Sequence, residues 1–296
     1  MPTAVVHPCD ETSLGGALDA AAGGLIVPIL VGPVLRIEAV AAALGRELGS
    51  AGKAFEIVDV PHSHAAAAKA VELVRLGRAE LLMKGGLHTD ELMHEVMEKE
   101  TGLRTGRRVS HIFIMDVPNY PRVLFITDAA VNIFSTLLDK RDIVQNAIDL
   151  ARALGVEQPK VALLSAVETI TPKIPSTIEA AALCKMADRG QITGGLIEGP
   201  LALDNAIDPD AARIKGISSP VAGRADILVV PDLEAGHMLA KNLTFLAGAD
   251  AAGIVLGARV PIVLTSRADT AMTRMASCAV AALYAHRLML VQPVNG

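Results

Sequence analysis

The sequence VALLSAVETITPKIPSTIEAAALCKMADRGQITGGLIE, which runs from Val161 to Glu198, contains one complete strand–helix–strand pattern. Val161–Ser165 and Leu196–Glu198 are short apolar runs, and the segment between them repeats its apolar residues at helical spacing. Ser176-Thr177-Ile178-Glu179 matches the capping box, in which a hydroxyl and a carboxylate satisfy free backbone N–H groups at a helix start. A helix from this motif to Gly190, between two strands that are apolar on both faces, predicts an α/β fold with parallel strands.

The same alternation extends in both directions along the chain. Further apolar runs predict strands at Phe55–Val60, Leu81–Lys84, Val109–Met115, Val123–Thr127, Ile227–Val230 and Ile262–Thr265. Helical spacing predicts helices from Thr89 or Asp90 to Gly102, from Asp139 to Gly155, and from Leu233 to Leu246. Strands and helices that alternate this often indicate α/β domains with mostly parallel sheets.

Two breaks divide this series, one with glycine and proline at Leu154–Pro159 and a second at Gly248–Gly257. We expect a discontinuous first α/β domain, residues 1–145 plus 253–296, and a second α/β domain, residues 146–252.

The composition excludes several classes of protein. The chain has 296 residues, of which 51% are hydrophobic and 2% aromatic, and its net charge is -5. This hydrophobic fraction supports a large core, whereas the few aromatic side chains and the negative charge argue against nucleic-acid and membrane partners. Cys9, Cys184 and Cys278 form no CxxC pair, and no basic segment followed by an apolar run begins the chain. We therefore expect a reducing, cytoplasmic location without disulfides.

Polar residues follow the predicted strands, at the edge where ligands bind in open α/β sheets. They are Lys84-Gly85-Gly86, Asp128, Ser165, Glu198, Asp232 and the stretch Thr265–Asp269. Each one alone is also explained by a turn or a helix cap. Ser266 and Arg267, at the start of a predicted helix, offer a hydroxyl, a guanidinium and free backbone N–H groups to an oxyanion. Asp269 suits a general base, an orienting partner of Arg267 or an N-cap.

Other motifs are missing or have simpler explanations. The Lys84 turn lacks the order of a Walker loop, and the chain has no GxGxxG sequence. The pairs His62/His64 and His88/His94 lack the spacing of HExxH, so we predict no metal site. Cys184 lies among alanine and leucine residues, where core packing is a better interpretation than nucleophilic catalysis.

Five of these segments together resemble the phosphate acetyl/butyryltransferase family, and the resemblance runs from about Val71 to the C-terminus in the family's order. They are Leu82-Met83-Lys84-Gly85-Gly86-Leu87-His88-Thr89, Ile126-Thr127-Asp128-Ala129-Ala130-Val131-Asn132, Glu198-Gly199-Pro200-Leu201-Ala202-Leu203-Asp204-Asn205-Ala206, Val230-Pro231-Asp232-Leu233-Glu234-Ala235-Gly236 and Leu264-Thr265-Ser266-Arg267-Ala268-Asp269. Two of these motifs, the Lys84-Gly85 turn and Ser266-Arg267-Ala268-Asp269, are more similar to the butyryltransferase branch of the family than to the acetyltransferase branch. In the acetyltransferase branch an aspartate follows the Ser-Arg pair, about where Thr273 stands here.

The resemblance implies two α/β domains like those of isocitrate and isopropylmalate dehydrogenases, an active site in the cleft between them, and a homodimer. It implies reversible acyl transfer between coenzyme A and phosphate, with an acetyl or butyryl group, through a ternary complex and without a metal or other cofactor. Carried over by position, Ser266, Arg267 and Asp269 would be catalytic, with Asp128 as a second candidate base. The substrates would contact Lys84, Gly85, Arg108, Ser110, Asp128, Asn132 and Asp232.

Two other functions are compatible with parts of this pattern. Related domains of malic enzymes sense acetyl-CoA without catalysis, although the Ser266-Arg267 pair favours an enzyme. A dehydrogenase of the same architecture would need a cluster of metal-binding aspartates and an arginine-rich carboxylate pocket, which the sequence does not show.

Overall fold

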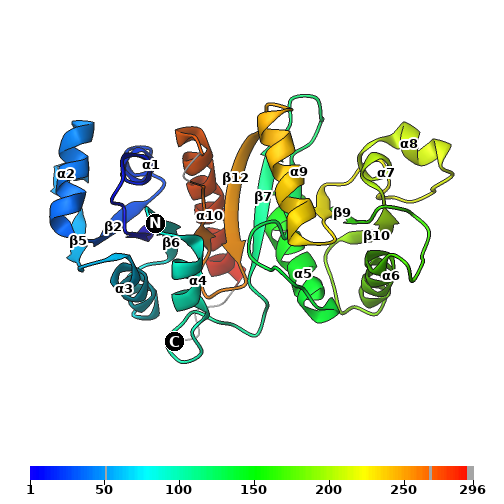
Figure 1. The fold of residues 1–296 in the computed structure, drawn as a ribbon, viewed down its shortest axis with the longest axis horizontal. Helices are drawn as coiled ribbons and strands as arrows, with labels where there is room; N and C mark the ends of the chain where they lie inside the picture. Colours follow the sequence, from blue (N-terminus) through cyan, green and yellow to red (C-terminus); the bar gives the residue numbers. More distant parts are fainter. Residues whose placement is uncertain (51, 267–268, 292–296) are drawn as a thin grey trace. The chain divides into compact units, whose positions relative to one another are not determined.

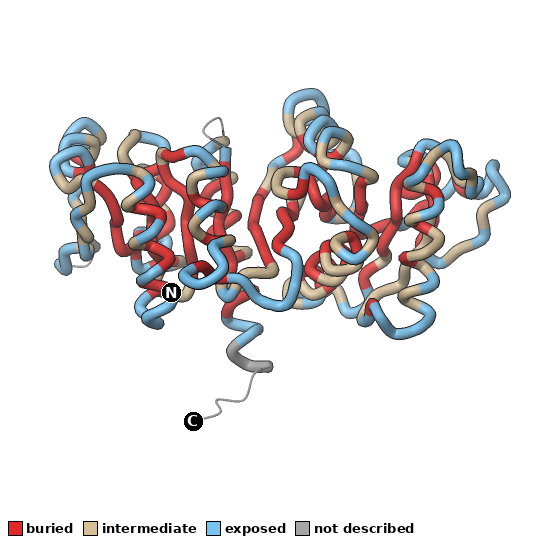
Figure 2. The backbone as a smooth tube through the Cα atoms, turned by 60° about the horizontal axis from the view of Figure 1, so that its bottom comes forward, coloured by how far each residue is buried: buried red, intermediate tan, exposed pale blue. Residues whose placement is uncertain are grey.

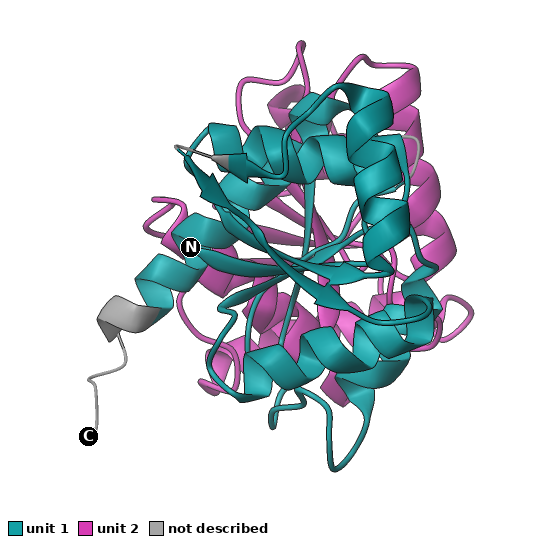
Figure 3. Ribbon diagram, turned by 90° about the vertical axis from the view of Figure 1, so that its left-hand side faces the viewer, with its two compact units in different colours: residues 1–107, 252–296 teal, residues 108–251 magenta. Residues whose placement is uncertain are grey.

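The computed structural model describes residues 1–296 except residue 51, residues 267–268 and residues 292–296. Its contacts divide the chain into two compact units (Figure 3). The first unit contains Met1–Arg107 and Ala252–Gly296, and the second contains Arg108–Ala251. The sequence had suggested a first boundary near residue 145. The structure instead groups residues 108–145 with the second unit, because the helix that begins at Leu137 packs on strands of that unit.

The first unit is built on a sheet in the order β13-β6-β1-β2-β5 (Figure 1). Its parallel strands are β1 (Pro2–Val6), β2 (Val27–Gly32), β5 (Glu56–Asp59), β6 (Leu81–Lys84) and β13 (Ile262–Val263). Strand β12 (Asp250–Leu256) pairs with β13 in the antiparallel direction, and β3 (Gly49–Ser50) and β4 (Lys53–Ala54) form a separate hairpin. The helices are α1 (Glu11–Ala22), α2 (Val34–Leu44), α3 (Ser63–Arg75), α4 (Thr89–Met97) and α10 (Ala271–Val291).

The second unit has five strands in the order β10-β9-β11-β8-β7. Strands β8 (Leu124–Thr127), β9 (Lys160–Leu164), β10 (Leu196–Leu201) and β11 (Ile227–Val229) are parallel, whereas β7 (Ser110–Asp116) runs antiparallel to β8. The helices are α5 (Leu137–Ala153), α6 (Pro175–Asp188), α7 (Leu203–Ile207), α8 (Pro209–Ile214) and α9 (Leu233–Phe245). The mixed α/β architecture with mostly parallel strands is thus confirmed.

The core of each unit lies between the sheet and its helices, so that strands are buried and the outer faces of helices are exposed (Figure 2). Small branched side chains and alanine fill this core, as the scarcity of aromatic residues implies. Among the described residues, no helix combines the length and the apolar character that crossing a membrane requires.

The structure corrects one local prediction and adds elements that the sequence did not indicate. No capping box forms at Ser176: α6 begins at Pro175, the Ser176 hydroxyl bonds to that of Ser165 at 2.8 Å, and the Glu179 carboxylate pairs with Lys140. Helix α5 begins two residues before Asp139, since Thr136 is its N-cap and Asp139 completes the capping box from the third helical position. Strands β1, β2, β3, β4 and β12 and helices α1, α2, α3, α7 and α8 were not predicted, whereas the helix expected after Ser266 is present as α10.

Candidate functional site

The turn after β8 is organised around Asp128, which is 5% exposed. Its Oδ1 accepts hydrogen bonds from the backbone N–H groups of His111, Ala130 and Val131, at 3.2, 3.1 and 3.1 Å. Its Oδ2 accepts from the backbone N–H of Asn132 at 3.0 Å and from the Asn132 side-chain amide. Five donors use the acceptor capacity of one carboxylate, so Asp128 closes the turn and has no lone pair to offer a substrate proton.

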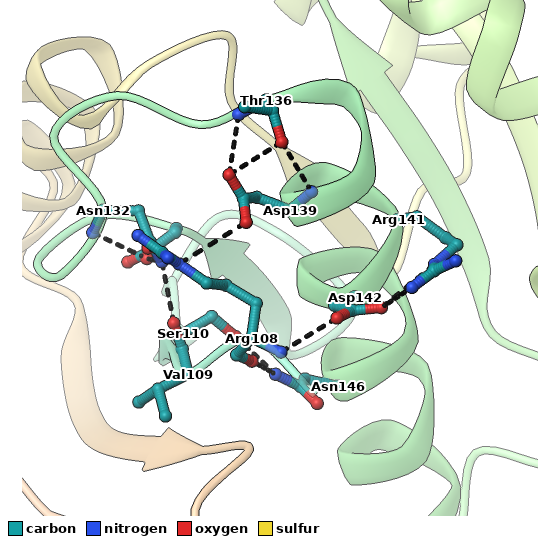
Figure 4. Close-up of polar contacts among 10 residues, drawn as sticks. Arg108, Val109, Ser110, Asn132, Thr136, Asp139, Arg141, Asp142 and Asn146 are labelled. Carbon is teal, nitrogen blue, oxygen red and sulfur yellow. Dashed lines mark hydrogen bonds and ion pairs between the residues drawn. The ribbon is translucent and has the colours of Figure 1, made fainter. Parts of the chain in front are cut away.

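Asn132 links the Asp128 turn to Arg108, which lies at the start of the second unit (Figure 4). The Asn132 amide nitrogen donates to the carbonyl of Val109 at 2.8 Å, and its Oδ1 accepts from Nε of Arg108 at 2.6 Å. The same Nε lies 3.7 Å from Oδ1 of Asp139, in the first turn of α5. The Arg108 side chain therefore has a fixed direction, although 41% of it is exposed.

The free end of Arg108 is what this arrangement presents to solvent. Its contacts engage Nε and the backbone, and among the described residues neither Nη group has a hydrogen-bond partner. A planar guanidinium with two such donors can bind a phosphate or carboxylate through paired hydrogen bonds. Burial alone would raise the pKa of the Asp139 carboxyl, but hydrogen bonds from Thr136 and the Arg108 charge outweigh it and hold the pKa below its usual value.

Ser110 belongs to the same cluster but is completely buried. Its hydroxyl accepts a hydrogen bond from the Asn146 amide at 2.8 Å, and that amide also donates to the carbonyl of Arg108 at 2.9 Å (Figure 4). The backbone N–H of Arg108 donates to Asp142 at 2.9 Å. In this conformation Ser110 therefore supports the backbone under Arg108 and offers no surface to a ligand.

A small hollow, partly open to solvent, adjoins this cluster and is lined by Asp128, Asn132, Ser135, Lys140, Ile143 and Val229–Leu233. Lys140 is 8% exposed, pairs with Glu179 and donates to the carbonyl of Pro231 at 2.8 Å. Asp232 also lines the hollow, and its carboxylate is the N-cap of α9, where it accepts from the N–H of Ala235 at 2.8 Å. No pattern in the sequence indicates this role of Lys140, because a lysine within an amphipathic helix is ordinarily on its solvent face.

In the first unit, the Lys84-Gly85-Gly86 turn lies against the end of β1. A Cβ on Gly85 would lie 2.8 Å from the carbonyl oxygen of His7 and closer still to that of Val6, so only glycine fits there. The N–H groups of Gly85 and Gly86 donate to these same two carbonyls, at 2.9 and 2.8 Å. Lys84 is 5% exposed, and its ammonium donates to the carbonyl of Gly85 at 3.4 Å.

The stretch after β13 brings Ser266 and Asp269 together, while Arg267 lies outside the described residues. The Asp269 carboxylate accepts from the backbone N–H of Ser266 at 2.6 Å, and the Asp269 N–H donates back to the Ser266 carbonyl at 3.1 Å. The Thr270 hydroxyl, not Asp269, accepts from the N–H of Thr273 at the start of α10. Asp269 thus closes the loop that carries the exposed Ser266.

The candidate residues form two separate groups, one in each unit. Arg108, Ser110, Asp128 and Asn132 form one hydrogen-bonded cluster, and Asp232 shares the hollow beside it. Lys84, Gly85 and Ser266 follow β6 and β13, which are neighbouring strands of the first unit. Among the described residues, no group of three or more histidine, cysteine, aspartate or glutamate side chains is arranged to hold a metal ion.

The thiol of Cys184 is protonated at neutral pH. Burial raises its pKa to about 11, and the nearby carboxylates of Glu198 and Asp188 act in the same direction. The side chain lies 3.6 Å from the carbonyl of Gly199 and packs in the second unit, which agrees with a structural role.

Comparison with known proteins covers nearly the whole chain. The model of the family described as phosphate acetyl/butaryl transferase matches residues 33–282. The chain is 73% identical to a Rhizobium meliloti protein named phosphate acetyltransferase, over 98% of this chain and 90% of the relative. It is 45% identical to a Clostridium acetobutylicum protein named phosphate butyryltransferase, over 93% of this chain and 90% of the relative. The solved structure of a branched-chain phosphotransacylase from Enterococcus faecalis V583 matches with a TM-score of 0.80 at 30% identity, over 97% of this chain and 99% of that one.

Proposed function

The chain belongs to the phosphate acetyl/butyryl transferase family, and we propose that its strand-end groups bind and activate the substrates of that family's reaction. The enzyme transfers an acyl group reversibly between coenzyme A and inorganic phosphate. The observation that carries this function is the 73% identity to a phosphate acetyltransferase over 98% of the chain.

The reaction needs anion binding beside a thioester carbonyl. A phosphate oxygen attacks the carbonyl carbon, the oxyanion of the tetrahedral intermediate forms, and the C–S bond breaks as acyl phosphate is released. The coenzyme A thiolate leaves and takes up a proton; in the reverse direction its thiol must lose one. Fixed hydrogen-bond donors and cations accelerate such a reaction by stabilising the oxyanion and by holding phosphate in line for attack.

We assign anion binding in the second unit to Arg108. Its Nη groups lack a partner among the described residues, whereas Nε is held by Asn132 and Asp139, so the guanidinium is oriented without being neutralised through its outer nitrogens. Asp128, Asn132 and Ser110 then act by holding the backbone and side chain of Arg108, and Asp232 acts as a helix cap at the wall of the hollow.

In the first unit, we propose that Ser266 and Arg267 contact the phosphate or the acyl carbonyl. The exposure of Ser266 supports this role, and the Lys84-Gly85 turn lies at the end of the adjacent strand β6. Asp269 is the preferred candidate for the base, because five donors already use the acceptor capacity of the Asp128 carboxylate. These groups supply polarisation and proton transfer themselves, so we propose a ternary complex that uses no metal ion or further cofactor.

We propose acetyl as the preferred acyl group. The motif sequences resemble the butyryltransferase branch. Relatives with 73% and 57% identity, however, are named phosphate acetyltransferase, and the relative named phosphate butyryltransferase from Clostridium acetobutylicum has 45% identity. We further propose that the enzyme is cytoplasmic, which its widely separated cysteines favour, and that it is a homodimer, which the resemblance implies and which light scattering of the purified protein would test.

The direct test follows free thiol released from acetyl-, propionyl- and butyryl-CoA, each with and without phosphate. Phosphate-dependent release of coenzyme A, largest for acetyl-CoA, is the expected result. Binding of acetyl-CoA without any release would point to the sensor domain and would refute the enzyme. Arg267→Ala should remove most of the release, and Arg108→Gln should raise the KM for phosphate by about tenfold or more, as expected for the loss of a charged contact.

A further inference from the structure

A buried guanidinium lies behind Ser266 that neither the sequence motifs nor the assignments above include. Arg274, in the first turn of α10, is 3% exposed. Its Nη1 donates to the hydroxyl of Thr265 at 2.9 Å, and its Nη2 donates to the carbonyl of Ser266 at 2.8 Å. The side chain therefore donates two hydrogen bonds to the segment that follows β13, where the chain enters the loop with Ser266.

The charge of Arg274 is not neutralised by an ion pair. Among the described residues no carboxylate lies within ion-pair distance of its guanidinium, and both of its hydrogen-bond acceptors are neutral oxygens. The carboxylate of Asp10, the N-cap of α1, interacts electrostatically with this charge from beyond ion-pair distance. Burial would raise the pKa of the Asp10 carboxyl, but hydrogen bonds from Thr12 and Ser13, with a smaller contribution from Arg274, hold it below its usual value. A buried cation with neutral partners favours an anion bound nearby.

The neighbouring helix leaves room for this side chain. Gly16 of α1 faces its aliphatic part, and a Cβ on Gly16 would lie 2.5 Å from Cδ of Arg274. The adjacent Gly15 differs, because a Cβ there would meet only Cδ1 of Leu44, at 3.8 Å. Gly16 therefore leaves the space that the Arg274 side chain occupies between α1 and α10, whereas Gly15 does not contact this side chain.

The Ser266 peptide is held from both sides as a result. Its carbonyl accepts from Arg274 and from the Asp269 N–H, and its own N–H donates to the Asp269 carboxylate. These three hydrogen bonds fix the backbone on both sides of the Ser266 side chain and so limit where its hydroxyl can lie. Small displacements of such a group reduce turnover strongly, because the bound geometry sets the transition state.

We propose that Arg274 is a positioning residue for acyl transfer, which fixes the Ser266 peptide and places an uncompensated positive charge behind it. The inference rests on the proposed function, since it needs Ser266 to contact the phosphate or the acyl carbonyl. Its effect is on the transition state more than on substrate affinity, so it predicts a loss in kcat with little change in the KM for acyl-CoA.

The test compares three variants with two matched controls. Arg274→Met removes both donors and the charge, Arg274→Lys restores the charge without the fork, and Gly16→Ala displaces the arginine while leaving it intact. Arg287→Met removes an exposed arginine of the same helix, and Gly15→Ala makes the same change at the adjacent glycine. Each is assayed for kcat and for the KM of acetyl-CoA and phosphate, beside circular dichroism and thermal unfolding.

We expect Arg274→Met to lower kcat by about 100-fold with the KM for acetyl-CoA within about threefold of the parent, Arg274→Lys to recover part of this loss, and Gly16→Ala to lower kcat by about tenfold. Both controls should keep the parent kcat. A folded Arg274→Met enzyme with kcat within threefold of the parent overturns the inference. A variant in which only the KM for a substrate rises, with kcat unchanged, overturns it as well.

If Arg274→Met does not fold, the other two variants decide: parent kcat in both overturns the inference, and a lowered kcat in Gly16→Ala but not in Gly15→Ala supports it. An inactive parent protein would instead refute the proposed function, and the inference with it.

Discussion

Replacing Asp128 by asparagine tests whether this carboxylate is architectural. The two side chains have the same shape, but asparagine has one acceptor oxygen and one donor group in place of two acceptor oxygens. In the structure, three N–H groups point at Oδ1 and two donors of Asn132 point at Oδ2. Either orientation of the new amide therefore turns an NH₂ group toward donors in a site that is 5% exposed.

The cost follows from the less damaging orientation. With the amide oxygen toward the three N–H groups, two donors of Asn132 lose their acceptor, and each unsatisfied buried donor costs about 1–3 kcal/mol. The remaining bonds also weaken, because the acceptor is no longer charged. We expect Asp128→Asn to lower the free energy of unfolding by about 4 kcal/mol, and Arg108 to lose its fixed direction through Asn132.

Urea unfolding followed by circular dichroism measures this loss, with Asp232→Asn as the matched control. Asp232 caps α9 through a single N–H, and asparagine caps helices as well as aspartate does, so its change should stay below about 0.5 kcal/mol. A loss below about 1 kcal/mol at Asp128 would show that the hydrogen-bond reasoning is wrong. If that stable variant were also inactive, Asp128 would be the base after all.

Three further predictions concern other parts of the chain. Gly85→Ala should cost roughly 3 kcal/mol or prevent folding, because its Cβ would press on the β1 carbonyls, whereas Gly106→Ala, whose Cβ meets nothing within 4 Å, should be neutral in the same unfolding assay. Cys184, with a thiol pKa that burial raises to about 11, should resist iodoacetamide at pH 8 in the folded protein and react once the chain is denatured, as mass spectrometry of the peptide would show. The lowered pKa of Asp139 stabilises the folded state above the usual carboxyl value of 3.8, so the stability difference between the parent and Asp139→Asn should be present at pH 7 and disappear as the pH falls below that value; a difference that grows in acid would contradict this sign.

The sequence predicted the central strands well because they carry their signal locally. The strand at Leu81–Lys84 has the predicted bounds, and most others agree within a few residues. The predictions fail where residues distant in the sequence determine the hydrogen bonds of a side chain. Ser176 has the composition of a helix cap, yet its hydroxyl bonds to Ser165, and Glu179 pairs with Lys140 of another helix. In Ala17–Val34, a helix and a strand follow one another within one apolar run, so neither period stands out.

The sequence indicates which strand ends carry polar candidate residues, but it does not indicate what each side chain does there. Strand ends identified Asp128, Asp232 and Ser266, because ligands and helix caps share the same edge of a parallel sheet. Only the hydrogen bonds separate the two uses: five donors occupy Asp128, and one backbone N–H defines Asp232 as a cap. The sequence missed Arg274 for a related reason, since a basic residue in a helix reveals neither its burial nor its partners.

These contacts suggest how the two kinds of charge are divided between architecture and chemistry. The carboxylates of Asp128 and Asp232 are used by backbone N–H groups, which keeps their acidic charge tied to a turn and a helix start. The Arg274 guanidinium is oriented by neutral oxygens instead, and Arg108 meets the Asp139 carboxylate through Nε, so the outer nitrogens of Arg108 stay available to an anion. An enzyme that must hold phosphate beside a thioester needs this division, because a carboxylate on the outer nitrogens of these arginines would compete with the anion for them.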